Sequence, residues 1–172
     1  MEFYEVIRKR LSIRAYKPEP IPEDVLSRIL EAGRLAPSAK NLQPRKFIVI
    51  KDASVRKLLV LACNGQEFIG QAPIVICACA LEDKAWGTMG GYWKSDAVDV
   101  TIALEHMVLA AAAEGLGTCW IGSFTEAEVK KVLGIPGNVK PIALTPLGYP
   151  ACESEPKPRK PISEIVCYDH FR

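Results

Sequence analysis

The sequence contains few histidines, almost no net charge and no long hydrophobic run. Its longest apolar run, residues 74–81, is far shorter than the roughly 20 residues that a transmembrane helix needs. The formal net charge of +2 is too small to favour a nucleic-acid-binding protein. Neither of the two histidines has a second ligand at metal-site spacing. We therefore expect no nucleic-acid partner, no membrane partner and no metal site.

Three common nucleotide-binding or catalytic motifs are also missing. Gly115 and Gly117 are not followed by the third glycine of a dinucleotide-binding fingerprint, and Lys94 is not preceded by the glycine of a phosphate-binding P-loop. No Gly-x-Ser-x-Gly elbow of a serine hydrolase occurs. Side-chain acid–base and metal catalysis have little support, so a bound cofactor is the expected carrier of any chemistry.

The composition is typical of one globular domain, which we assign to residues 1–172. Hydrophobic residues make up 49% and charged residues 24% of the chain. The chain opens without a basic segment leading into an apolar one, so no secretory signal is predicted and a cytoplasmic location is expected. Cys77 and Cys79 alternate within an apolar run, which predicts that both are buried on one face of a strand.

Apolar periodicity and turn-forming residues predict alternating helices and strands. Two helices come first and several connections are too short for crossover helices, which favours a mixed sheet between helical layers. The N-caps expected are Ser54, Ser95 and Thr125, the last in a capping box with Glu128. Residues 36–44 are predicted to be a loop, and the irregular segment 82–93 to lie over a ligand mouth. The predicted helices are residues 2–10, 22–35, 55–62, 66–69, 97–113 and 125–134, and the predicted strands are residues 47–50, 74–80, 118–121 and 139–147.

Two segments predict a second subunit. The helix expected over residues 97–113 is apolar nearly all round, and one small chain cannot easily bury every side of it. The proline-rich segment 150–161 is too extended to form a core of its own, so we expect it to be an arm that lies on a partner. Pro141 and Pro146 each remove a donor from the last strand, which predicts an edge position or a bulge.

Basic residues cluster near both ends of the chain. Arg10 and Arg14 flank Ser12 near the N-terminus, and Lys157 and Arg159 lie in the C-terminal arm. Two solvated basic segments are the ordinary explanation of such clusters. The alternative is one anion site whose halves are brought together by folding, and composition does not decide between the two.

Four motifs, in order along nearly the whole chain, resemble the nitroreductase family of FMN-dependent NAD(P)H oxidoreductases. The first is Arg10-x-Ser12-x-Arg14. The second is Ala-Pro-Ser-Ala-x-Asn-x-Gln-Pro over residues 36–44. The third is Gly-Leu-Gly-Thr-Cys-Trp-Ile-Gly over residues 115–122, followed by Leu-Gly-Ile-Pro over 133–136. The fourth is Leu-Gly-Tyr-Pro over residues 147–150 with Lys-Pro-Arg-Lys-Pro over 157–161.

The resemblance implies an α+β fold: a three-layer α/β/α sandwich with a central mixed, largely antiparallel sheet and a C-terminal arm that extends onto the partner of a homodimer. It also implies two FMN sites at the interface, with the first and last motifs around the phosphate, ribityl chain and pyrimidine edge. Loop 37–41 would come from the other subunit, and amides near residue 122 would face the ring. The implied cofactor-binding residues are Arg10, Ser12, Arg14, Pro37, Ser38, Ala39, Asn41, Gln66, Ile121, Gly122, Ser123, Lys157 and Arg159.

Three residues depart from the family pattern. Leu11 replaces a frequent arginine and Ala39 a frequent serine, so each loses side-chain hydrogen bonds but keeps its backbone contacts. Arg45 stands where tryptophan often follows Gln-Pro and places a cation near the loop. The resemblance leaves these effects open, and with them the choice between NADH and NADPH.

The function implied is a ping-pong transfer of hydride from NAD(P)H through flavin N5 to a small acceptor such as a nitroaromatic or a quinone, with no catalytic side chain. Segment 82–93 is the expected acceptor lid, although no residue there identifies the acceptor. A flavin-binding storage or sensor protein without turnover is the alternative. A nucleic-acid surface formed by the basic termini is a third alternative, and the small net charge disfavours it.

Overall fold

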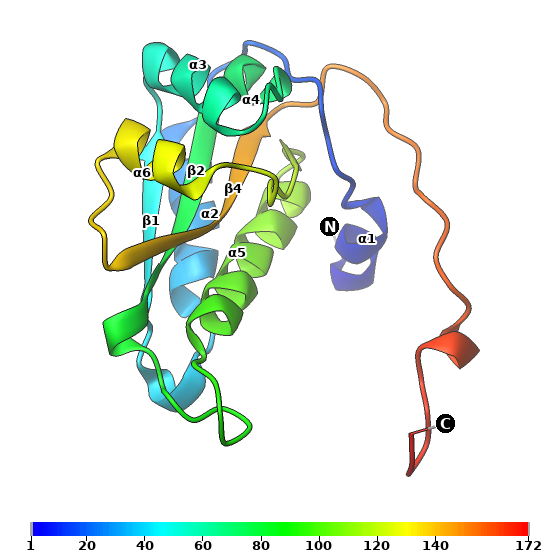
Figure 1. Ribbon diagram of the computed structural model, residues 1–172. Helices are drawn as coiled ribbons and strands as arrows, with labels where there is room; N and C mark the ends of the chain where they lie inside the picture. The colour runs from blue at the N-terminus through cyan, green and yellow to red at the C-terminus, as the bar shows by residue number, and fades with distance from the viewer. Residues whose placement is uncertain (1, 172) are drawn as a thin grey trace.

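The computed structural model describes residues 2–171, and its element order follows the predicted alternation (Figure 1). All the major predicted helices and strands are present, with shifts of a few residues at their ends. The helices are α1 Phe3–Lys9, α2 Glu23–Leu35, α3 Ala53–Ala62, α4 Phe68–Gln71, α5 Asp96–Ala113 and α6 Glu126–Leu133, with short 3₁₀ turns η1 Ala39–Asn41, η2 Glu82–Lys84 and η3 Ile162–Glu164. The strands are β1 Arg45–Ile50, β2 Ile74–Leu81, β3 Gly117–Thr118 and β4 Val139–Gly148.

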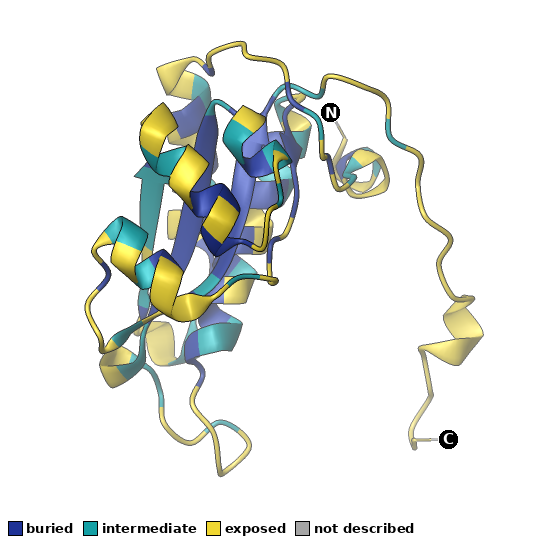
Figure 2. Cartoon of the chain, turned by 45° about the horizontal axis from the view of Figure 1, so that its top comes forward, coloured by how far each residue is buried: buried dark blue, intermediate teal, exposed yellow. Residues whose placement is uncertain are grey.

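The four strands form one sheet in the order β1-β2-β4-β3, and each neighbouring pair is antiparallel. A single parallel bridge between Ser12 and Thr118 adds the N-terminal segment to the edge beside β3. Strand β2 is buried on both faces: Ile76 and Ala78 alternate with Val75 and Cys77 between two separate hydrophobic clusters. Helices α2 and α5 cover one face, and α3, α4 and α6 cover the other (Figure 2). The predicted three-layer α/β/α fold is confirmed.

The cysteines of the sheet and Pro141 follow the predictions, whereas Pro146 pairs with Val75 inside the sheet without the predicted edge position or bulge. Cys77 and Cys79 are buried on one face of β2, with their sulfur atoms 3.7 Å apart. Strand β4 lies inside the sheet and carries the predicted irregularity, a register shift where Pro141 pairs with Cys79. Within residues 2–171, no helix combines the length and the apolarity that a membrane span needs.

The N-cap predictions were wrong in detail at three helices. Helix α3 is capped by Asp52, whose carboxylate accepts hydrogen bonds from the backbone of Ser54 and Val55. Ser95 occupies the N-cap position of α5, but its hydroxyl donates to Asp99 at 2.7 Å and makes no side-chain cap. Thr125 begins α6 without the side-chain hydrogen bond of a capping box. The sequence pattern identified each helix start to within about two residues, and at α3 and α5 a nearby carboxylate decided the hydrogen bond.

Helix α5 is less completely buried in one chain than its composition predicts. Thr101, Glu105, His106 and Ala113 are exposed. The segment after β4 is extended and exposed along nearly its whole length (Figure 2). Large apolar side chains on it also face solvent, including Ile162, Ile165 and Tyr168. The second subunit that would cover these surfaces stays a prediction.

The N-terminal segment after α1 packs closely against β3 and the end of β4. Ile13 donates its backbone N–H to Thr118 at 2.8 Å, and Lys17 donates to Tyr149 at 2.9 Å. Gly117 permits this approach, since a Cβ there would lie 2.5 Å from the Ile13 side chain. The chain leaving β4 is also tied to this segment, because Ala151 donates to Ala15 at 3.0 Å. Residues from both ends of the sequence are therefore held side by side.

We predict that Gly117→Ala lowers the free energy of unfolding by about 1–3 kcal/mol, because the added methyl group overlaps Ile13 and forces the N-terminal segment outward. Gly137→Ala is the matched control, since nothing lies within 4 Å of a Cβ built there. Urea denaturation at one fixed protein concentration compares the two variants. Equal stability of both would contradict the close packing at β3.

Candidate functional site

The basic residues of the two chain ends line one cavity. Its volume is about 230 Å³, and Arg10, Ser12 and Arg14 lie on the N-terminal side. Lys157 and Arg159 come from the arm on the other side. The remaining lining residues are Leu11, Ser154 and Glu155. Folding therefore brings the two basic clusters together around one cavity, as the second of the two explanations requires.

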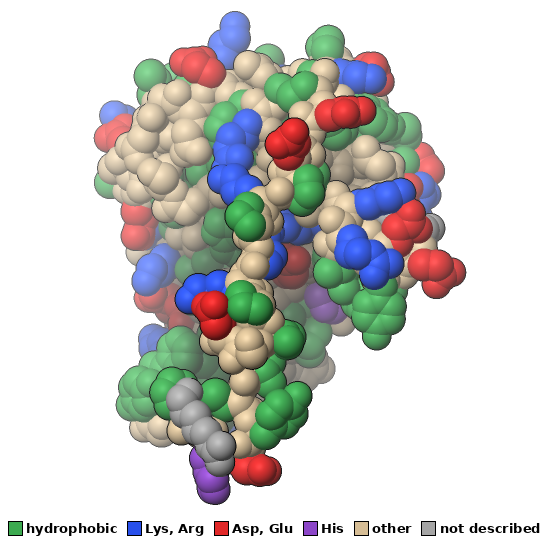
Figure 3. All heavy atoms as spheres, turned by 90° about the vertical axis from the view of Figure 1, so that its right-hand side faces the viewer, with side chains coloured by type: hydrophobic (Ala, Val, Ile, Leu, Met, Phe, Trp, Pro, Cys, Tyr) green, Lys and Arg blue, Asp and Glu red, His purple; other side chains and the backbone are tan. Residues whose placement is uncertain are grey.

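The cavity carries a strong positive charge. Its lining contains four cationic side chains and one carboxylate, that of Glu155. Figure 3 shows basic side chains along the part of the arm that leaves the core. The Arg159 guanidinium folds back on its own segment and donates to the backbone oxygens of Lys157 at 3.0 Å and Pro158 at 3.3 Å. Convergent cations and a hydroxyl are the groups that bind a phosphate.

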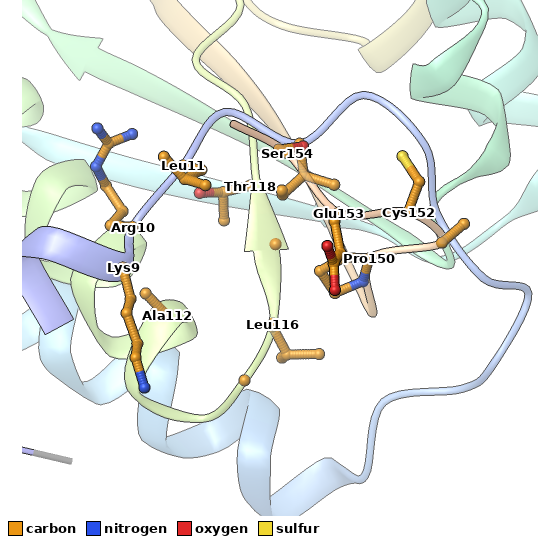
Figure 4. A pocket seen from close by; sticks show the side chains of 14 residues that line it. Lys9, Arg10, Leu11, Ala112, Leu116, Thr118, Pro150, Cys152, Glu153 and Ser154 are labelled. Carbon is orange, nitrogen blue, oxygen red and sulfur yellow. The ribbon is translucent and has the colours of Figure 1, made fainter. Parts of the chain in front are cut away.

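A larger cavity of about 800 Å³ adjoins this basic cavity (Figure 4). The two share Arg10, Leu11 and Ser154, and Arg10 stands between them. The larger cavity is bordered by the end of α1, the last turn of α5, β3 and residues 150–154. Its volume is within the range of roughly 300–1,000 Å³ that is common for small-molecule sites. Together the cavities combine a larger space with a smaller, positively charged one.

Segment 118–123 leads away from the basic cavity. Burial raises the pKa of the Cys119 thiol, and this rise is opposed by the nearby Arg14 charge and a hydrogen bond with Ser12. Ile121 is buried and exchanges backbone hydrogen bonds of 2.8 and 3.1 Å with Leu144. The contacts of Cys119 and Ile121 hold the segment in place. The turn at residues 122–123 therefore starts from a fixed point of the backbone.

The turn at residues 122–123 is exposed and is held by the end of α3. Gln66 donates from its side-chain amide to the backbone oxygens of Ser123 at 3.0 Å and Cys63 at 2.9 Å. Asn64, which the sequence analysis missed, donates to the Ser123 hydroxyl at 3.0 Å. Asn64 precedes Gly65 and has a φ of 57°, and an Asn-Gly pair is the only signal of this turn in the sequence. Gln66 was predicted at a ring edge, and its amide nitrogen is occupied by protein oxygens.

Loop 37–41 lies away from both cavities in the same chain. The backbone N–H of Ala39 donates to Asp99 in the first turn of α5, whereas the larger cavity touches Ala112 in the last turn. Asp99 and Ala112 are 13 residues apart on α5, so these two points are about 20 Å apart at 1.5 Å per residue. Pro37, Ser38, Ala39 and Asn41 are therefore not brought to the basic cavity of their own chain, and their predicted approach to a partner's site stays a prediction.

Arg45 secures this loop to the end of α2. Its guanidinium donates to the backbone oxygens of Arg34, Ala36 and Pro37 at 3.0, 2.6 and 3.2 Å. Burial lowers the pKa of Arg45, and the Asp99 charge opposes that shift. The last carbonyls of a helix have no partner within the helix, so Arg45 satisfies groups that would otherwise need water. Arg45, which departs from the family pattern, thus stabilises the backbone between α2 and the loop.

Comparison with known proteins agrees with the fold. The sequence profile described as "Nitroreductase family" matches residues 7–66 and 59–149. The chain belongs to the nitroreductase family. Through this membership it is an oxidoreductase.

Individual members of the nitroreductase family match most of the chain. A Thermus thermophilus protein named NADH dehydrogenase is 34% identical over 191 residues, covering 93% of this chain and 92% of that protein. The crystal structure of a nitroreductase family protein from Clostridium difficile 630 has a TM-score of 0.91 at 31% identity, and the match covers 99% of this chain and 100% of that chain. The NADPH:FMN oxidoreductase from Vibrio harveyi complexed with NAD+ has a TM-score of 0.89 at 27% identity, covering 99% and 78%.

We predict that Arg45→Met lowers the free energy of unfolding by about 1–3 kcal/mol, because the backbone oxygens at the end of α2 lose their donor. Lys46→Met is the control, an exposed cation on the same strand. Chemical denaturation measures both. A loss as large for Lys46→Met would show that Arg45 has no special role at the helix end.

Proposed function

We propose that this nitroreductase-family protein is a homodimeric FMN-dependent enzyme that takes hydride from NAD(P)H and reduces a small acceptor such as a nitroaromatic or a quinone. The observation that carries the proposal is the convergence of Arg10, Ser12, Arg14, Lys157 and Arg159 on one cavity of a nitroreductase fold. The relatives support it, because the Vibrio harveyi protein is by name an NADPH:FMN oxidoreductase.

The residues present fit a flavin mononucleotide. Arg10, Lys157 and Arg159 supply the charge that a phosphate needs, and the Ser12 hydroxyl adds a donor. Each charge-assisted hydrogen bond is worth about 1.5–3 kcal/mol. The exposed turn at Gly122 and Ser123 offers backbone donors for a ring, and buried Ile121 supports that turn from below. Segment 118–121 connects Thr118, which pairs with Ser12, to this turn, so we assign the phosphate to the basic cavity and the ring to the turn.

The placement of loop 37–41 supports the proposed homodimer. Along α5, about 20 Å separates Asp99, which binds this loop, from Ala112 in the larger cavity, so in our proposal a second copy adds Pro37, Ser38, Ala39 and Asn41 to the site. The exposed face of α5 and the exposed apolar side chains of the arm are consistent with a surface that a second copy covers. The complete site would therefore draw on both chains.

When bound, FMN would supply the hydride chemistry that the side chains of this chain do not. Arg14 would place a positive charge beside the pyrimidine edge, where it favours any state of the bound group that carries more negative charge. Gln66 and Asn64 would hold the Ser123 turn rigidly against the ring. A single open face would serve NAD(P)H and the acceptor in turn, so the two would bind alternately.

The first test is the visible spectrum of the purified protein before and after anaerobic addition of NADH. A yellow protein that is bleached by NADH and recovers its colour with a quinone supports the enzyme. A yellow protein that NADH does not bleach would support storage or sensing of flavin. A colourless protein that also binds no added FMN would overturn the proposal.

We predict that Arg10→Ala weakens FMN binding roughly 10- to 150-fold, since one charge-assisted hydrogen bond is lost at the phosphate end. Lys17→Ala is the matched control, because Lys17 belongs to the same N-terminal segment but pairs with Glu19. Quenching of flavin fluorescence during titration gives both dissociation constants. Equal affinities of the two variants for FMN would contradict the assignment of the phosphate to this cavity.

Arg14→Ala tests the assignment of the pyrimidine edge to Arg14. We expect weaker FMN retention and slower reduction by NADH, because the positive charge at the pyrimidine edge is removed. Anaerobic stopped-flow measurements on protein saturated with FMN separate the rate from the occupancy. Unchanged FMN content together with an unchanged reduction rate would contradict the assignment.

A further inference from the structure

A buried carboxylate joins the loop at residues 37–41 to the segment that precedes α5. The Asp99 side chain is 2% exposed, and its two oxygens bind different segments. One oxygen accepts from the backbone N–H of Ala39 at 2.9 Å, and the other accepts from the Ser95 hydroxyl at 2.7 Å. Ser95 is fully buried. A buried charge is tolerated only when it is paired or hydrogen-bonded, so these two bonds account for its place in the core.

The same two segments meet at a second point. The Lys40 ammonium lies 5.3 Å from the ring centroid of Trp86, close enough for a cation–π contact. Ser95 also donates its backbone N–H to the Trp86 backbone oxygen at 2.9 Å. Displacing Ser95 would therefore move Trp86, and with it the contact to Lys40.

The loop itself has an unusual backbone that needs such support. Lys40, Asn41 and Gln43 have φ values of 51°, 57° and 50°, in the left-handed region that side chains disfavour. The Ser38 backbone oxygen and hydroxyl accept from Asn41 and Gln43, each at 2.9 Å. Conformations of this kind persist only where surrounding contacts over-determine them, and they are concentrated at functional sites. Asp99 supplies the contact at Ala39.

Beyond Trp86 the segment forms a small hairpin with exposed rings. Met89 pairs with Trp93, and the rings of Tyr92 and Trp93 are stacked with their centroids 6.3 Å apart. Tyr92 is 83% exposed and Trp93 is 42% exposed. Figure 1 places this connection between β2 and α5 at the same end of the molecule as the loop before β1. Exposed stacked rings form a surface that a flat molecule can contact.

We infer that Asp99 is a positioning residue that fixes loop 37–41 and the hairpin at residues 89–93 relative to each other. Ser95 carries the effect of Asp99 to the hairpin. The inference rests on the proposed function, in which the loop contacts FMN, and on the expectation from the sequence that segment 82–93 contacts the acceptor. Asp99 touches neither ligand. It acts on FMN through Ala39 and on the acceptor through Ser95 and Trp86, so the two effects are separable by substitution.

Ser95→Ala removes one of the two links and leaves the Asp99 bond to Ala39 in place. We expect the KM for a nitroaromatic acceptor to rise about fivefold, the effect of losing one ordinary hydrogen bond, with the dissociation constant of FMN unchanged. Ferricyanide, a compact acceptor without a ring to stack, should keep its kcat/KM.

Asp99→Ala removes both links, so both the KM for the nitroaromatic and the dissociation constant of FMN should rise. Asp99→Asn keeps an oxygen that can accept from Ala39 and should restore FMN binding, which also covers the case that Asp99→Ala does not fold. Glu128→Gln is the matched control, since it removes a carboxylate from the first turn of another helix, α6. It should change neither constant.

The outcomes separate the two proposals. A wild-type protein that binds no FMN overturns both. A wild-type protein that turns over, while Ser95→Ala leaves the KM for the nitroaromatic and Asp99→Ala leaves the dissociation constant of FMN at their wild-type values, overturns the positioning role alone. Equal losses with the nitroaromatic and with ferricyanide in Ser95→Ala would also overturn it, because a general structural defect would not distinguish the acceptors.

Discussion

The backbone contact of residues 12–17 with β3 and with the end of β4 is the constraint on which the candidate site depends. The N-terminal segment would otherwise leave the core after α1, and the arm would leave it after β4. The bonds from Ile13 to Thr118 and from Ala151 to Ala15 hold these two exits beside each other. The small residue Gly117 makes the approach sterically feasible. Without this contact, the basic residues of the two chain ends would be separate surface charges.

Bringing like charges together is unfavourable in the absence of an anion, so the clustered cations of the cavity favour the binding of one. Among the described residues that line the basic cavity, Glu155 is the only acidic one beside Arg10, Arg14, Lys157 and Arg159. Mutual repulsion among them would be relieved by a phosphate, whose charge-assisted hydrogen bonds are strongest in a partly enclosed space. The electrostatics thus favour a bound anion over an empty cavity. In our proposal this anion is the phosphate of FMN, and the flavin ring of the same molecule carries the chemistry.

Local sequence patterns locate the ends of the helices but do not predict which side chains form the hydrogen bonds there. Serine and threonine mark the starts of α3, α5 and α6 in the sequence, yet Asp52 caps α3 and Ser95 turns to Asp99. Arg45 departs from the family motif and binds the carbonyls at the end of α2. Such choices depend on which acceptor is nearest in space. They could be identified only once the chain was folded.

By itself the sequence determined the alternation of helices and strands, the buried double-sided strand β2, the bulge near Pro141 and the family, because these follow from periodicity and from motifs among near neighbours. It also supplied the residues of the basic cavity, but not their convergence. The tertiary structure decided that convergence, the clamp of Asn64 and Gln66 on Ser123, and the role of Asp99 between two loops. These partners are far apart along the chain, so no local sequence pattern connects them. Only folding brings them within hydrogen-bonding distance.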